Sequence, residues 1–307
     1  MPLTDEQRRI LEECQKRLPR FLFRGFNSRS GGGNPHLNNH MGVIPHGFNG
    51  TGLRPTTIDD IPNLVEMIDD HLTGRHTPSC FSSWVADLDV ALEYSGRSVD
   101  SWVAIIDTNL LADHVKIHHV PAFHHADLAG DGYHQEYLSY DMYHPGYLEY
   151  DMYDHEYLAY GPIEGPAYHC VKYMDITFPQ LNLNRELYRI WWYSSSPLFF
   201  VSVEQTLDMI STAERTAFLF RRADDTRPDV VIALTAFLMA HCCVSARDSD
   251  IVHLAGIMFR HFSPMLGNLE WPPQKLGLVN QETYVTSYLK LEIAVRILTL
   301  IEGWLPT

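Results

Sequence analysis

The chain has 307 residues, 45% of them hydrophobic and 20% charged, and it can bury the core of one large domain or two ordinary ones. Its formal net charge of −15 argues against a nucleic-acid backbone or an anionic membrane as the main partner. Five cysteines, with Cys242 and Cys243 adjacent, do not have the pattern of a disulfide framework.

Residues 1–20 predict an amphipathic helix with mixed charges, and they lack the apolar core of a secretory signal. The longest apolar run, residues 230–244, contains His241 and is typical of a buried helix rather than a membrane span. We therefore expect a cytoplasmic protein with reduced cysteines and no transmembrane helix.

Up to about residue 180, short alternating segments rich in Gly, Pro, His and Tyr predict small strands joined by long loops. The Gly- and Asn-rich stretch 27–52 is longer than a compact connection needs, which favours a functional loop. Residues 57–72 and 88–94 are predicted as helices, and residues 102–107 as a buried strand.

Beyond residue 180 the segments are longer and have helical periodicity. Apolar residues recur at helical spacing in residues 204–222, 229–245, 248–261 and 281–304. We therefore predict two domains, residues 1–180 and 181–307, the second a helical bundle or a helical layer on the first.

A tyrosine-rich repeat with a period of ten residues has copies that begin at Tyr137, Tyr147 and Tyr157. Three short copies are too few for a solenoid, and a duplication that lengthened a surface loop explains them. The last copy continues into Gly-Pro-Ile and predicts an apolar strand that begins next to Glu156.

Three motifs in this order resemble the ADP-ribosyltransferase chain of the cholera and heat-labile enterotoxins, the Arg–Ser–Glu class. They are Arg24 in LFRGFNSRSGG with the turn GVIPHG after it, Ser82 and Ser83 in FSSW, and Glu156 in EYLAYGPI. Uncharacterised intracellular fungal domains with the pattern FRG, FSSW and EYLxxG are also similar. The resemblance covers residues 18–176 and implies an α+β fold with a split small-sheet core, followed here by an all-helical C-terminal region.

The resemblance implies an NAD-dependent mono-ADP-ribosyltransferase that also hydrolyses NAD when no acceptor is present. Glu156 is the expected catalytic carboxylate, because cleavage of the nicotinamide–ribose bond develops positive charge on the ribose. Arg24 and Gly25 are expected to bind the diphosphate, since a guanidinium offers forked donors. Ser82 and Ser83 are expected to hold the ribose or to position Glu156.

Glu136 is an alternative to Glu156, because the repeat presents Glu-Tyr-Leu twice, but only the second copy continues into Gly-Pro-Ile. Asp154 is a further catalytic candidate two residues before Glu156, where relatives that modify arginine carry Glu or Gln. Its shorter side chain reaches a guanidinium less easily, which argues against arginine specificity. Trp84 stands where the family usually has Ser.

The enlarged loop from Tyr137 to Tyr153 is expected to contact a protein acceptor. The alternative function is a catalytically inactive domain of the same fold that acts as a protein-interaction module. Histidines crowd residues 114–134, but no Cys-x-x-Cys or His-Glu-x-x-His motif accompanies them, so we expect surface loop histidines rather than a metal site.

Overall fold

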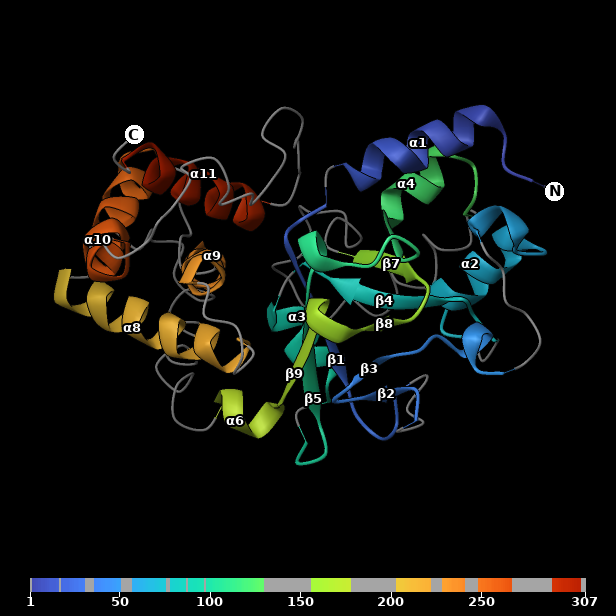
Figure 1. Cartoon of the computed structure of the whole chain (residues 1–307), viewed down its shortest axis with the longest axis horizontal. Helices are drawn as coiled ribbons and strands as arrows, with labels where there is room; N and C mark the ends of the chain where they lie inside the picture. Colours follow the sequence, from blue (N-terminus) through green and yellow to red (C-terminus); the bar gives the residue numbers. More distant parts are fainter. Residues whose placement is uncertain are drawn as a thin grey trace, which may run out of the picture. The chain divides into compact units, whose positions relative to one another are not determined.

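The computed structural model describes residues 2–16, 18–30, 36–50, 57–75, 78–86, 88–96, 98–129, 156–177, 203–221, 228–240, 248–266 and 289–304. The chain divides into two compact units, Met1–Tyr173 and Met174–Thr307. The first contains antiparallel sheets with helices and the second contains helices, which confirms the predicted α+β class with a helical C-terminal region (Figure 1).

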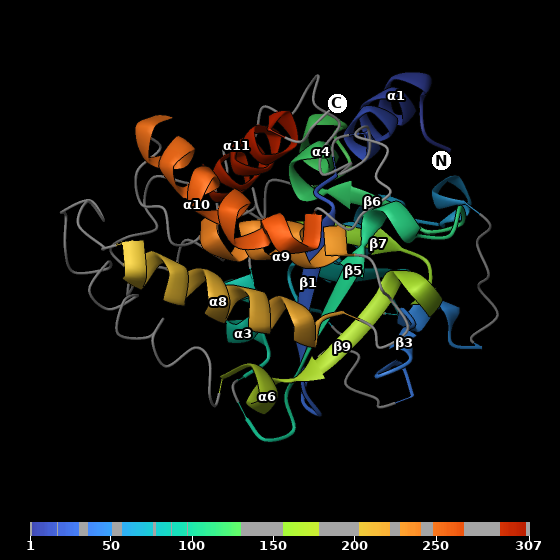
Figure 2. The same ribbon diagram turned by 60° about the vertical axis from the view of Figure 1, so that its left-hand side comes forward.

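A six-stranded antiparallel sheet forms the centre of the first unit. Its order is β6-β7-β4-β1-β5-β9, so strands far apart in the sequence become neighbours. The strands are β1 (Phe21–Phe26), β4 (Phe81–Val85), β5 (Trp102–Asp107), β6 (Lys116–His119), β7 (Glu156–Tyr160) and β9 (Tyr168–Lys172). Figure 2 shows β1, β5 and β9 side by side. The predicted strand at residues 102–107 is confirmed as β5.

The sheet is split between β4 and β1. These two strands share the single register pair Phe23↔Val85, whereas β1 pairs with β5 along its whole length, from Phe21↔Asp107 to Phe26↔Trp102. The sheet therefore consists of two halves, β6-β7-β4 and β1-β5-β9, which are joined at the pair Phe23↔Val85 in the described residues.

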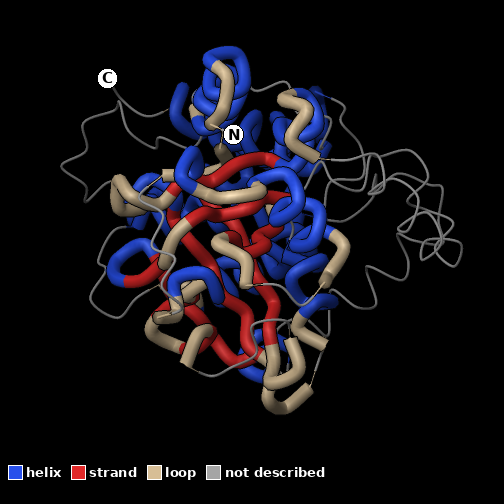
Figure 3. The backbone as a smooth tube through the Cα atoms, turned by 90° about the vertical axis from the view of Figure 1, so that its right-hand side faces the viewer, coloured by secondary structure: helices blue, strands red, loops and turns tan. Residues whose placement is uncertain are grey.

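A second, three-stranded sheet has the order β2-β3-β8 (strands are red in Figure 3). Its strands are β2 (Asn38–Asn39), β3 (Gly42–Val43) and β8 (Ile163–Glu164). The first two lie within the stretch predicted as a loop. They form strands because β3 finds a distant partner in β8, through Gly42↔Glu164 and Val43↔Ile163.

The two faces of the six-stranded sheet pack into different hydrophobic clusters, because successive strand side chains point to opposite sides. One face, through Phe81, Leu158 and Tyr160, packs on helices in what we call the helix-side cluster. The other face, through Trp84 and Tyr157 among others, packs on the second sheet in the second-sheet cluster.

Three helices contribute to the helix-side cluster: α1 (Asp5–Gln15), α2 (Leu64–Leu72) and α4 (Val120–His125). A fourth, α3 (Leu88–Tyr94), packs on β1 and has the predicted bounds. The predicted helix at residues 57–72 is interrupted. A short 3-10 turn at Ile58–Asp60 ends before Pro62, and Asn63 has φ 54° before α2 begins. A proline disfavours helical backbone at the residue before it, which explains the break.

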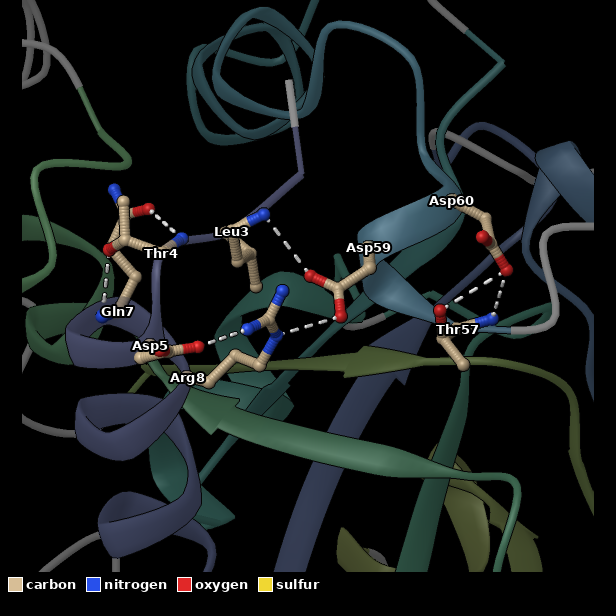
Figure 4. A network of polar contacts seen from close by, with 8 residues as sticks. All are labelled: Leu3, Thr4, Asp5, Gln7, Arg8, Thr57, Asp59 and Asp60. Carbon is tan, nitrogen blue, oxygen red and sulfur yellow. Dashed lines mark hydrogen bonds and ion pairs between the residues drawn. The ribbon is translucent and has the colours of Figure 1, made fainter.

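The N-terminal segment is fastened to the turn that leads into α2. The helix α1 begins with a capping box in which Thr4 Oγ1 accepts from Gln7 N at 3.2 Å and Thr4 N donates to Gln7 Oε1 at 2.9 Å. The Asp59 carboxylate accepts from Leu3 N at 3.2 Å and from Arg8 Nε at 3.1 Å (Figure 4). These bonds help to fix the segment that carries α2.

The second unit contains the four predicted helices, with shifted ends: α8 (Val203–Leu219), α9 (Pro228–Ala240), α10 (Asp248–Leu266) and α11 (Leu289–Gly303). The other three contact α9, whose side chains are buried almost throughout from Val230 onward, as the apolar run predicted. His261 Nε2 lies 2.9 Å from Glu214 Oε2 and links α10 to α8. The short α6 (Tyr173–Thr177) follows β9. Of the helices described, none combines the length and apolarity that crossing a membrane requires.

Candidate active site at the split in the sheet

Arg24 connects the two halves of the sheet at the split. Its Nη1 donates to the backbone carbonyl of Ser83 in β4 at 2.7 Å. Its Nε is buried and has no hydrogen-bond partner within the described part of the chain. Burial lowers the pKa of Arg24 to about 10, so the guanidinium keeps its charge at neutral pH. The split therefore contains a positive charge with one donor left unused.

Gly25 fixes the backbone beside Arg24 by close packing. A Cβ at this position would lie 1.8 Å from Ala91 O and 2.5 Å from Ser95 N, so only glycine lets β1 approach α3 this closely. The structure thus gives Gly25 a packing role next to the expected diphosphate-binding arginine.

Ser82 and Ser83 lie on opposite faces of β4. The Ser82 hydroxyl is buried on the side of the second-sheet cluster and accepts from Trp84 Nε1 at 2.9 Å. The half-buried Ser83 side chain lies on the helix-covered face, level with Leu158 of β7. The structure brings Ser83 close to Arg24, whereas the Ser82 hydroxyl holds the indole of Trp84.

His71 in α2 was not among the residues expected from the sequence. Its Nδ1 lies 2.9 Å from Ser79 Oγ, and its Nε2 lies 2.9 Å from Ser83 Oγ. Burial, and then the charge of Arg24, lower the pKa of His71 to about 4, so the ring is neutral at neutral pH. The sequence did contain one signal for a buried histidine at this position. His71 comes three residues after Ile68 and lies beside the apolar stripe of a predicted helix.

Glu156 is the first residue of β7 and is half-buried. It pairs with Val85, which also pairs with Phe23, so Glu156 and Phe23 are separated by two strand spacings, about 10 Å between Cα atoms. Because Val85 and Ser83 alternate with Trp84, Glu156 lies on the same face as Ser83 and diagonal to it. Ser83 and Glu156 thus share the helix-covered face of β4 and β7, and His71 bonds to Ser83 there. Arg24 pairs with Ala104 on the side of the second-sheet cluster and reaches the Ser83 carbonyl at the split.

Several expected residues lie outside the described residues: Asp154, Glu136, the loop from Tyr137 to Tyr153 and residues 31–35 of the Gly- and Asn-rich stretch. The structure gives no account of their positions.

The expectation of surface histidines is wrong for His118. It lies on β6, is 1% exposed, and packs its ring 5.4 Å from that of Phe123. Neither ring nitrogen of His118 has a hydrogen-bond partner in the described ranges, and burial lowers its pKa to about 3. The neighbouring His119 stacks on Tyr157 at 4.7 Å. No group of three or more His, Cys, Asp or Glu side chains in this described part is placed to hold a metal ion.

No curated protein and no solved structure matches the chain. One family profile, Domain of unknown function (DUF7587), matches residues 17–176, a span that begins before β1, ends after β9 and includes Arg24, His71, Ser83 and Glu156. Since this span is more than half of the 307 residues, the protein belongs to the DUF7587 family.

Proposed function

We propose that the first unit is an NAD-dependent mono-ADP-ribosyltransferase that also hydrolyses NAD when no acceptor is bound. The observation that carries this proposal is the split in the sheet. The charged Arg24 side chain bonds to the Ser83 carbonyl there, and Glu156 begins the next strand on the face of the Ser83 hydroxyl.

In the proposed reaction the bond between nicotinamide and C1′ of the ribose breaks, and its electron pair leaves with nicotinamide. The positive charge that develops on the ribose is stabilised by the Glu156 carboxylate, which also orients the 2′-hydroxyl. An acceptor nucleophile, or water, then forms a bond to C1′ and loses its proton. Arg24 binds the diphosphate through its charge and its unused Nε–H.

A second candidate is a catalytically inactive domain of the same fold that binds a protein partner. It is favoured by the burial of Arg24 Nε, which must become reachable before a diphosphate can accept its hydrogen bond. The engagement of the Ser82 hydroxyl by Trp84 points in the same direction, because one of the expected substrate contacts is already occupied.

Nicotinamide release from NAD by the full chain distinguishes the two. We expect the wild type to release nicotinamide and Glu156→Gln to release it at least about 100-fold more slowly, since the amide keeps the shape of the side chain but removes its charge. Glu164→Gln, an exposed site in β8, is the matched control and should keep the wild-type rate. Equal rates for Glu156→Gln and wild type contradict the proposal. A folded protein that releases no nicotinamide favours the inactive module.

A further inference from the structure

A chain of hydrogen bonds joins the start of β4 to the Ser83 hydroxyl. Phe81 N donates to Ser79 Oγ at 3.1 Å, Ser79 Oγ lies 2.9 Å from His71 Nδ1, and His71 Nε2 lies 2.9 Å from Ser83 Oγ. Two short contacts from one imidazole fix both the position and the rotation of the ring. The reaction outlined above does not use this histidine.

Either direction of these hydrogen bonds leaves one serine hydroxyl hydrogen without an acceptor, and the two serines differ in burial. A neutral imidazole carries one N–H. If it is on Nδ1 and donates to Ser79, the hydroxyl hydrogen of the buried Ser79 has no acceptor among the described residues. If it is on Nε2, Ser79 donates to Nδ1 and Nε2 donates to Ser83 Oγ, and the hydrogen left free is that of the half-buried Ser83 rather than that of the buried Ser79.

We propose that His71 is a positioning residue: by donating to Ser83 Oγ it leaves the Ser83 hydroxyl hydrogen free to bond an oxygen of the nicotinamide-side ribose next to Glu156. This inference rests on the proposed function. Ser83 is the junction, because its hydroxyl accepts from His71 while its carbonyl accepts from Arg24 Nη1. Through His71, the helix α2 thereby orients the Ser83 hydroxyl. It also contacts the residue whose carbonyl holds the Arg24 side chain.

The ribose is the part of NAD that suits this hydroxyl. The diagonal position of Ser83 and Glu156 on neighbouring strands places their Cβ atoms about 7 Å apart, a span that one sugar ring with its hydroxyls fills. A hydroxyl that donates here and a carboxylate that accepts can hold two oxygens of the same ring.

Two amide variants separate the two bonds of His71. The longer Gln at position 71 reaches Ser83 but not Ser79, and Asn reaches Ser79 but not Ser83. We expect His71→Asn to lower kcat for nicotinamide release about tenfold or more, with a much smaller change in KM for NAD, and His71→Gln to restore most of the rate. His125→Asn, at an exposed histidine of α4, is the matched control and should keep the wild-type kcat.

A double-mutant cycle with Ser83→Ala completes the test. Once the Ser83 hydroxyl is removed, His71→Asn should have no further effect on kcat. If His71→Asn does not fold, His71→Ala, which also lacks the donor to Ser83, takes its place in the cycle. Additive losses, or equal activity of the Asn and Gln variants in an active protein, overturn this inference alone. A wild type that releases no nicotinamide overturns the proposed function and this inference with it.

Discussion

The two faces of the six-stranded sheet differ in what their side chains do. On the face toward the second sheet, Trp84 and Tyr157 are buried in an apolar cluster, and the Ser82 hydroxyl is used by the Trp84 indole. On the helix-covered face, the Ser83 hydroxyl bonds to His71, and Glu156 lies on the same side. Adjacent serines in one strand thus belong to different environments. The comparison teaches that both faces are packed into the core. The Ser83 hydroxyl, His71 and Glu156, which carry the candidate chemistry, lie on the helix-covered face.

The largest expected effect comes from the face toward the second sheet. Trp84→Ala removes a fully buried indole, and we expect the free energy of unfolding to fall by about 3–5 kcal/mol, because the cavity cannot collapse completely. Urea denaturation at neutral pH measures this. A loss below 1 kcal/mol would mean that the second-sheet cluster contributes little to stability.

The second prediction compares the two serines directly. Ser82→Ala leaves the buried Trp84 Nε1–H without its acceptor, so we expect a loss of about 1–3 kcal/mol in the free energy of unfolding, with little change in nicotinamide release. Ser83→Ala should do the reverse, with a smaller loss of stability and a lower kcat. If both variants lose activity alike, the assignment of roles by face is wrong.

The third prediction concerns pH and the helix-covered face. Burial lowers the pKa of His118 to about 3 in the folded protein, against about 6.5 in the unfolded chain, so below pH 6.5 the unfolded state binds the proton. The free energy of unfolding should therefore fall as the pH falls, by about 1 kcal/mol from His118 between pH 6 and pH 5. His71 acts in the same direction.

His118→Leu should make this acid-induced loss smaller, and it should stabilise the protein at neutral pH because two unsatisfied nitrogens are removed. The exposed His125→Leu is the control for replacing a histidine of this region by leucine. Urea midpoints measured at several pH values test this prediction. If the midpoint of His118→Leu falls with decreasing pH as steeply as that of the wild type, the prediction is contradicted.

The smallest effect is expected at Asp59, which fastens the N-terminal segment to the turn before α2 (Figure 4). Its bonds are partly exposed, and solvent screens such pairs. Asp59→Ala should lower the unfolding midpoint less than Ser82→Ala does. Because α2 carries His71, a lower rate of nicotinamide release by folded Asp59→Ala would show that this attachment also helps to position His71.

Local sequence patterns were sufficient for many elements. The helix at Leu88–Tyr94, the strand at Trp102–Asp107 and the four helices of the second unit follow from periodicity, which reflects which side of an element is buried. The break before α2 was also readable, since Pro62 lies inside the segment predicted as one helix.

The sequence by itself determined the class of fold, the two-part organisation and the strands that carry Arg24, Ser83 and Glu156. Only the tertiary structure decided which serine faces His71, because the direction of a strand side chain depends on the register with β7 and on what covers each face. It also turned residues 38–43 into strands, through pairing with β8. Such long-range partners leave no local pattern, so the contact of His71 with Ser83 appears only when α2 packs on the sheet.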